Sequence, residues 1–396
     1  MKGLSAGAYK TRTVSLGPYH HGDPDLLPME VHKRRALRHV VRRSGKTARE
    51  FAAAVEEVAE QLEGAYADLG DEWRGPGNRS RFLQVMATDG CFLLEVMMAA
   101  AGEHVGDYAP NDPVFSRHGL LYTVPHIRLD MVIMENQLPL LLLQKIMALE
   151  NPNNLNNEFV INRMVLMFLS SMLRPLPAGF GLALHPLDVI RRSFLSSQDK
   201  ITSTTVDNGY IIPSAYELYH AGIRFKAGNT ISPRCISFQN GVLTMPRFVM
   251  DDSSEYFFLN MMAFERLHAG AGNDVTEFVQ FLGSILLSAQ DVKLLCSEGV
   301  IENILHEDEV VVGMFKRLAK DFVLVRGSAI GLVYQQVYMY FWSSSCRNIT
   351  YWLTQFVNTY FHTPWKAISL FAGTVLLVLS IVQTVYAVLS FYRKKD

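Results

Sequence analysis

Several ingredients of common protein classes are scarce in this 396-residue chain. It has four cysteines without framework spacing, which excludes a small disulfide scaffold. Charged residues make up 19% of the sequence and hydrophobic residues 49%, which excludes a disordered chain. The 37 Lys and Arg almost cancel the 38 Asp and Glu. We therefore expect no nucleic-acid partner, because such proteins are usually strongly basic.

The sequence also lacks the local motifs of the common enzyme classes. It has no Gly-rich phosphate loop, no Gly-x-Ser-x-Gly nucleophile elbow and no cysteine pairs at zinc spacing. Residues 1–15 have no apolar run like that of a signal peptide. We therefore assign no catalytic, cofactor-binding or metal-binding residues, and an enzyme is the less favoured class.

Much of the apolar surplus lies at the C-terminus. Residues 367–389 carry no formal charge, and a helix of this length is about 34 Å long, enough to cross a bilayer core of about 30 Å. Trp365 precedes the run, and aromatic residues followed by Arg393, Lys394 and Lys395 end it. This pattern predicts one transmembrane helix over 367–389 and a short basic tail over 390–396. A long buried core helix is the alternative.

A single C-terminal span predicts a membrane protein of the plasma membrane or endoplasmic reticulum. The basic residues that flank the span barely favour a cytosolic tail, whereas insertion after synthesis and the pattern of the cysteines favour a cytosolic domain. We expect the cytosolic domain. The sequons at Asn78 and Asn348 would be glycosylated only if the domain were lumenal.

The chain before the span has mainly helical periodicity. A capping pair, Thr47 and Glu50, starts a helix that runs towards Gly70, and an apolar helix is predicted over about 80–101. Asp130, Glu135 and Asn136 lie in an apolar stretch, where we expect them to hydrogen-bond helix ends. The fold class is therefore mainly α, a helical domain over 14–362 that follows an N-terminal tail over 1–13.

One strong β signal interrupts the helices. Two short apolar runs flank Asn240-Gly241, a pair that tolerates the positive φ angles of a tight turn. This predicts a small β-hairpin between Cys235 and Met245. From Tyr334 to Trp365 many residues are aromatic, which fits either packing at the membrane interface or an aromatic core.

The alternative function is a metal-dependent helical enzyme that uses Asp251, Asp252 and Glu255. These acids resemble the aspartate-rich Mg²⁺ motif of terpene and prenyl synthases, but no matching second motif follows. Acidic residues also cap helix N-termini, and this is the favoured interpretation. His20 and His21, with Asp23 and Asp25, give only a weak metal signal.

The first 49 residues carry a net charge of about +8. On a helix that begins at Pro28, four apolar residues share one face, namely Met29, Ala36, Leu37 and Val40, and four arginines lie opposite. This basic face is either simply solvated or a contact for anionic lipid or an acidic partner. The four arginines are Arg34, Arg35, Arg38 and Arg42.

An ordered series of segments resembles a plant family known as domain of unknown function 247. The series begins with Val14-Ser15-Leu16-Gly17-Pro18-Tyr19-His20-His21-Gly22 and continues through Met29-Glu30, Lys33, residues 89–95, 130–139, 215–225, 241–246, 260–265, 291–292, 299–301 and 364–365 up to the C-terminal span. The resemblance covers nearly the whole chain and implies a single-pass membrane protein with no established enzymatic activity.

Some grass relatives in that family are genetically linked to self-incompatibility, which implies a recognition or signalling role. We therefore expect a membrane-anchored interaction or signalling component with a lipid bilayer and another protein as its partners.

Overall fold

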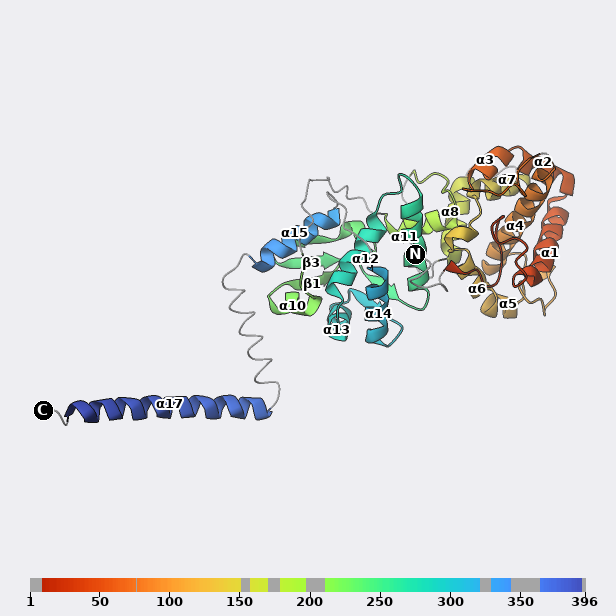
Figure 1. Ribbon diagram of the computed structural model, residues 1–396. Helices are drawn as coiled ribbons and strands as arrows, with labels where there is room; N and C mark the ends of the chain where they lie inside the picture. The colour runs from red at the N-terminus through yellow and green to blue at the C-terminus, as the bar shows by residue number, and fades with distance from the viewer. Residues whose placement is uncertain are drawn as a thin grey trace.

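The computed structural model describes residues 9–75, 77–150, 157–169, 179–196, 211–320, 329–342 and 364–393. Figure 1 shows an elongated body with α1 to α7 at one end and the strands and α10 to α15 towards the other, while α17 lies apart. One continuous cluster of buried apolar side chains runs from Val14 to Phe341, so both halves share a core. The predicted mainly helical class is confirmed for the described residues.

The first half is built around α4, Arg79–Ala100, which is apolar on nearly every side and buried over most of its length. A helix without a polar face must be surrounded by other elements. Its neighbours include α1, α2, α7 and α8. The helices of this half are α1 Leu27–Ser44, α2 Ala48–Glu56, α3 Ala59–Gly64, α5 Arg117–Tyr122, α6 Val124–Asp130 and α7 Leu140–Glu150, with the short 3₁₀ helices η2 Val105–Asp107 and η3 Met134–Asn136.

The capping pair predicted from the sequence is present. Thr47 accepts a hydrogen bond from the N–H of Glu50, and Glu50 accepts one from the N–H of Thr47. The single helix predicted from there towards Gly70 is wrong, because α2 ends at Glu56 and α3 begins at Ala59. Phe51, Val55 and Leu62 are all buried, so the two short helices keep one common apolar face despite the break.

The second half alternates helices with short strands. Its helices are α8 Asn157–Leu169, α9 Pro186–Phe194, α10 Ala215–His220, α11 Ser254–Leu267, α12 Asp274–Ile285, α13 Ala289–Ser297, α14 Asp308–Leu318 and α15 Ala329–Trp342, with the 3₁₀ helix η4 Pro233–Cys235. The inner face of α15 is buried through Tyr334, Val337 and Phe341, whereas Met339 and Trp342 are exposed. For the described part of the aromatic segment, the structure therefore divides the rings between the core and the surface.

The predicted hairpin is confirmed. Strands β2 Ser237–Gln239 and β3 Val242–Met245 pair antiparallel, and both residues of the Asn240-Gly241 turn have positive φ. Three strands escaped prediction: β1 Arg224–Ala227 pairs parallel with β3, and β4 Phe248–Met250 pairs parallel with β5 Ile301–Asn303. Strands of three or four residues are too short to show a clear alternation of apolar and polar residues.

Helix α17, Pro364–Arg393, contains the segment predicted to span a membrane. Among the described residues, one helix is long and apolar enough to cross a membrane, and that helix is α4. Two bent pairs of helices also meet this criterion if each pair is counted as one span. Of the most apolar part of α4, 89% is buried inside the protein. In α17 the apolar stretch found on the same basis is shorter, Phe371–Val385. The C-terminal span stays a prediction.

Some features predicted from the sequence lie outside the described residues. They are the sequon at Asn348, Cys346, most of the aromatic segment between α15 and α17, and the last residues of the basic tail. Of the other cysteines, Cys91 is buried, and Cys235 and Cys296 are half-buried; all three are free thiols.

Candidate functional site: buried polar networks around the N-terminal segment

The N-terminal residues 11–17 form an extended segment that is held by side chains from distant parts of the chain. Asp130, the last residue of α6, accepts hydrogen bonds from the backbone N–H groups of Arg12, Thr13 and Val14 at 3.0, 2.7 and 2.8 Å. Asp130 is 2% exposed. A buried backbone N–H needs a partner, and here one carboxylate replaces a neighbouring strand.

Asn136 continues this arrangement one step further along the segment. Its Oδ1 accepts from the N–H of Leu16 at 2.7 Å, and its Nδ2 donates to the carbonyl oxygens of Val14 and Asp130 at 3.1 and 3.0 Å. The prediction that these residues bond helix ends is therefore correct for Asn136, which binds the last carbonyl of α6. It is wrong for Asp130, whose carboxylate binds the backbone N–H groups of residues 12–14 instead of a helix end. Among the described residues, these N–H groups have no neighbouring strand to bind.

A buried ion network lies where this segment meets α1 and α4. Lys33 is fully buried, and its Nζ lies 2.7 Å from Asp89 and 2.6 Å from Glu30. Lys33 also donates to the hydroxyl of Ser15, and Asp89 accepts from the N–H of Gly17 at 2.9 Å. Burial raises the pKa of Asp89 to about 6, although the ammonium of Lys33 opposes that shift.

Sequence reasoning missed Lys33, yet its position carried a signal. Met29, Lys33, Ala36 and Val40 are spaced by three or four residues and are all buried in α1. A lysine on the apolar face of a helix requires a buried acid within reach, since an isolated buried charge is very unfavourable. The sequence does not show which acid this is, because Asp89 belongs to another helix, α4.

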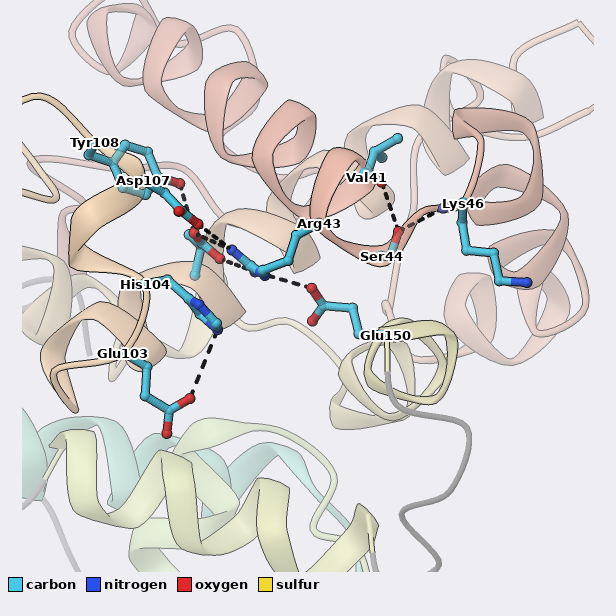
Figure 2. A network of polar contacts seen from close by, with 10 residues as sticks. Val41, Arg43, Ser44, Lys46, Glu103, His104, Asp107, Tyr108 and Glu150 are labelled. Atoms are coloured by element: carbon cyan, nitrogen blue, oxygen red, sulfur yellow. Dashed lines mark hydrogen bonds and ion pairs between the residues drawn. The ribbon is translucent and has the colours of Figure 1, made fainter.

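A second ion network lies between the end of α1, the end of α4 and α7. Arg43 forms a bidentate pair with Glu95, at 3.1 and 2.6 Å, and also contacts Glu150 and Asp107 at 3.1 and 3.3 Å. Figure 2 shows the guanidinium of Arg43 reaching between Glu150 and Asp107. Glu95 is fully buried and also accepts a hydrogen bond from Tyr108 at 2.9 Å. Burial raises the pKa of Glu150.

These two networks connect segments of the first half that lie far apart in the sequence. Their charged groups bind one another and the backbone, and a bidentate arginine–carboxylate pair fixes the position of both partners. The networks therefore join the N-terminal segment, α1, α4 and α7 into one unit.

The structure separates the four arginines of the basic face of α1. Arg35 lies 2.5 Å from the buried carboxylate of Asp112, so its charge is balanced within the body. Arg34, Arg38 and Arg42 are exposed. The pairing of Arg35 was not visible in the sequence because Asp112 lies in a distant loop.

The exposed arginines belong to a longer outward stripe. Leu27 and Val31 are 49% and 61% exposed, and at 100° per residue they fall with Arg34, Arg38 and Arg42 within an arc of about 80°. We call these five residues the α1 stripe. It has two aliphatic side chains at one end and three cations along the rest.

The acids of the alternative metal motif bind different partners. Asp251 accepts hydrogen bonds from the N–H of Ser253 and from the hydroxyls of Ser253 and Ser254, just before α11. Glu255 forms a bidentate pair with Arg317 at 3.1 and 3.0 Å, and Asp252 is exposed. Within the described residues there is no group of three or more His, Cys, Asp or Glu side chains that could hold a metal ion.

The paired histidines near the N-terminus lie in a turn. His21 packs edge-on against Trp73 at 5.6 Å, and burial lowers its pKa. Asp23 accepts from the backbone N–H of Asp25, and Asp25 lies 3.7 Å from Lys10. Both acids of the weak metal signal, Asp23 and Asp25, therefore have partners within the protein.

The fold and its networks define a mainly helical protein whose N-terminal segment is bound into the core by buried acids and an asparagine. The chain belongs to the plant family called domain of unknown function 247, described as "Plant protein of unknown function", whose model matches residues 1–379.

Two relatives from Arabidopsis thaliana are similar to this chain. The UPF0481 protein At3g47200 is 27% identical over 423 residues, which is 99% of this chain and 85% of that protein. The putative UPF0481 protein At3g02645 is 24% identical over 188 residues, which is 46% of this chain and 34% of that protein. No solved structure matches this chain.

Proposed function

We propose that this chain is a membrane-anchored interaction protein. In this proposal, α17 crosses a bilayer once and the helical body binds another protein. The observation that carries the proposal is the length and surface of α17. Its central 23 residues are uncharged, and a helix of that length matches the thickness of a bilayer core.

The side chains of α17 support insertion into lipid. Phe371, Leu376 and Leu377 are 73%, 67% and 63% exposed, and the other described apolar residues of the helix resemble them. Figure 1 shows α17 away from the body. A mainly apolar helix whose described side chains are exposed needs an apolar environment, because exposed apolar surface of this extent is unfavourable in water.

The first test replaces two central residues of α17 in the full-length chain. Leu377→Arg with Ile381→Arg should cost about 5–7 kcal/mol of insertion free energy. We expect this variant to move from the carbonate-resistant membrane pellet to the supernatant. The control is Leu267→Arg with Leu287→Arg, two exposed residues of the body, which should stay in the pellet. Retention of the α17 variant would refute the anchor.

The same protein tests the side of the membrane. We propose a cytosolic body, which the free thiols of Cys91, Cys235 and Cys296 support. Asn78 is exposed at the start of α4, so a lumenal body would present this sequon. A mobility shift after glycosidase treatment, lost in Asn78→Gln, would overturn the cytosolic placement. Unchanged mobility is the expected result.

For the protein partner we propose an acidic segment that docks on the α1 stripe. Three cations at four-residue spacing lie about 6 Å apart along the helix axis, which matches acids spaced by one helical turn in a partner helix. The stripe has only two aliphatic residues, which is little apolar surface to bury in a lipid interface. Figure 1 places α1 at the end of the body far from α15 and α17.

The docking test measures binding of a glutamate-rich helical peptide to the full-length chain. Replacing Arg34, Arg38 and Arg42 by Glu should abolish binding, and binding of the native chain should weaken at high salt. The control replaces three other exposed arginines by Glu, namely Arg74, Arg117 and Arg266. Equal binding by both triple variants would refute the stripe. Binding to phosphatidylserine vesicles but not to the peptide would assign it to lipid.

A further inference from the structure

A cavity in the second half of the body is separate from the networks and from α17. It has a volume of about 310 Å³ and lies between α9, α11 and the β4–β5 pair. This volume is at the lower end of the range for small-molecule sites. Four phenylalanines form much of its wall, namely Phe194, Phe248, Phe257 and Phe258.

The polar groups of the cavity are acids and hydroxyls. Glu302 and Asp251 line it together with Ser253 and Ser254, and no Lys, Arg or His belongs to the described lining. Val249 and Glu302 are paired residues of β4 and β5, so their side chains lie on the same face of the sheet. Glu302 is exposed, which places its carboxylate at the solvent side of the cavity.

Asp251 is held in place by its neighbours. Its Oδ1 accepts three hydrogen bonds, from the N–H and hydroxyl of Ser253 and from the hydroxyl of Ser254. Among the described residues, Oδ2 accepts none. A fixed carboxylate with a second oxygen available is suited to receive a donor from a ligand.

Aromatic walls and acidic groups favour the same kind of ligand. The face of a phenylalanine ring attracts a cation, and a carboxylate attracts it more strongly. An anionic ligand would be repelled by both acids and find no cationic residue in the described lining. An apolar substituent would displace water from the phenylalanines. The cavity thus combines a charge preference with an apolar compartment.

We propose that this cavity binds a small organic cation, an ammonium group that carries an apolar or aromatic substituent. The ammonium lies between Asp251 and Glu302, and the substituent packs against the phenylalanines. This proposal does not depend on the membrane anchor or on the α1 stripe, since the cavity residues belong to neither.

Calorimetry on the full-length chain in nanodiscs of neutral lipid tests the proposal, with empty nanodiscs as the blank. The probes are 2-phenylethylammonium and 3-phenylpropionate, which have similar shape and opposite charge. We expect the cation to bind at least tenfold more tightly than the anion. Equal affinities, or no binding of the cation, would overturn the proposal.

Variants locate the binding. Glu302→Gln should weaken binding of the cation about fivefold, whereas Glu309→Gln, which removes an exposed acid outside the cavity, should leave it unchanged. Val249→Trp should abolish binding by filling the space. If this variant melts at a lower temperature, Ile190→Phe, at another lining position, provides the second test. Undiminished binding by a folded cavity-filling variant would refute the site.

Discussion

The replacement Lys33→Met tests the buried network most directly. The variant keeps most of the side-chain volume but leaves Asp89, 1% exposed, without its cation, and Glu30 loses the same partner. Removing one member of a buried ion pair typically costs 3–5 kcal/mol, because the remaining charge stays buried. For a protein of this size, the expected loss in melting temperature is about 4–6 °C.

The pH dependence of this loss follows from Asp89. Burial raises its folded-state pKa to about 6 from the ordinary 3.8. Between these values the folded state holds the proton more tightly than the unfolded state, so the stability that Asp89 contributes falls as pH rises through this window. Without Lys33 the pKa rises further. The deficit of Lys33→Met should therefore be smaller at pH 5 than at pH 8.

Urea unfolding of the full-length chain, followed by the fluorescence of the buried Trp73, measures the effect. At pH 8 the double variant Lys33→Met with Asp89→Asn should recover at least half of the loss, because Asn still accepts from Gly17. The control Lys145→Met, which breaks an exposed pair with Glu57, should lose less than about 1 kcal/mol. A deficit that is independent of pH and of residue 89 would refute the reasoning.

Three further replacements test other parts of the fold. Asp130→Ala leaves the N–H groups of residues 12–14 without their acceptor and should cost about 3 kcal/mol; hydrogen exchange at these amides should rise, and unchanged protection would contradict the assignment. Arg43→Met leaves three acids without their cation and should lower the free energy of unfolding by about 2–4 kcal/mol at pH 8, as measured by urea unfolding. An unchanged free energy of unfolding would argue against the network. Gly241→Ala meets a positive φ, and its new Cβ lies too close to the hydroxyl of Tyr340, so thermal unfolding should show a loss of about 2 kcal/mol. The control Gly106→Ala, with open space around it, should change stability little.

Patterns local in the sequence predicted the fold well where one element suffices. The apolar helix α4, the Thr47 capping pair and the Asn240-Gly241 hairpin depend on neighbouring residues, and the structure has all three. The parallel pairs β1–β3 and β4–β5 depend on segments 18 and 53 residues apart at their first paired residues. Their pairing is decided by tertiary packing, which periodicity does not report.

The polar networks could be predicted only in part, because their partners lie far apart in the sequence. The position of Lys33 on an apolar face indicates a buried acid, but the sequence does not say that Asp89 provides it. Likewise the arginines of α1 look equivalent on a helical wheel, and only the loop that brings Asp112 to Arg35 distinguishes them. The cavity was invisible for this reason, since its acids come from two segments about 50 residues apart.

The two ion networks have a consequence for the way α1 lies against α4. Lys33 meets Asp89 and Arg43 meets Glu95, so two pairs connect the same two helices at different heights. Sliding α1 by one helical turn, about 5.4 Å, would separate both pairs at once and leave Asp89 and Glu95, both buried, without their cations. Apolar side chains of similar size would tolerate several such positions. We therefore expect the ions to select a single alignment of the helices, and this alignment fixes the direction in which the α1 stripe faces outward.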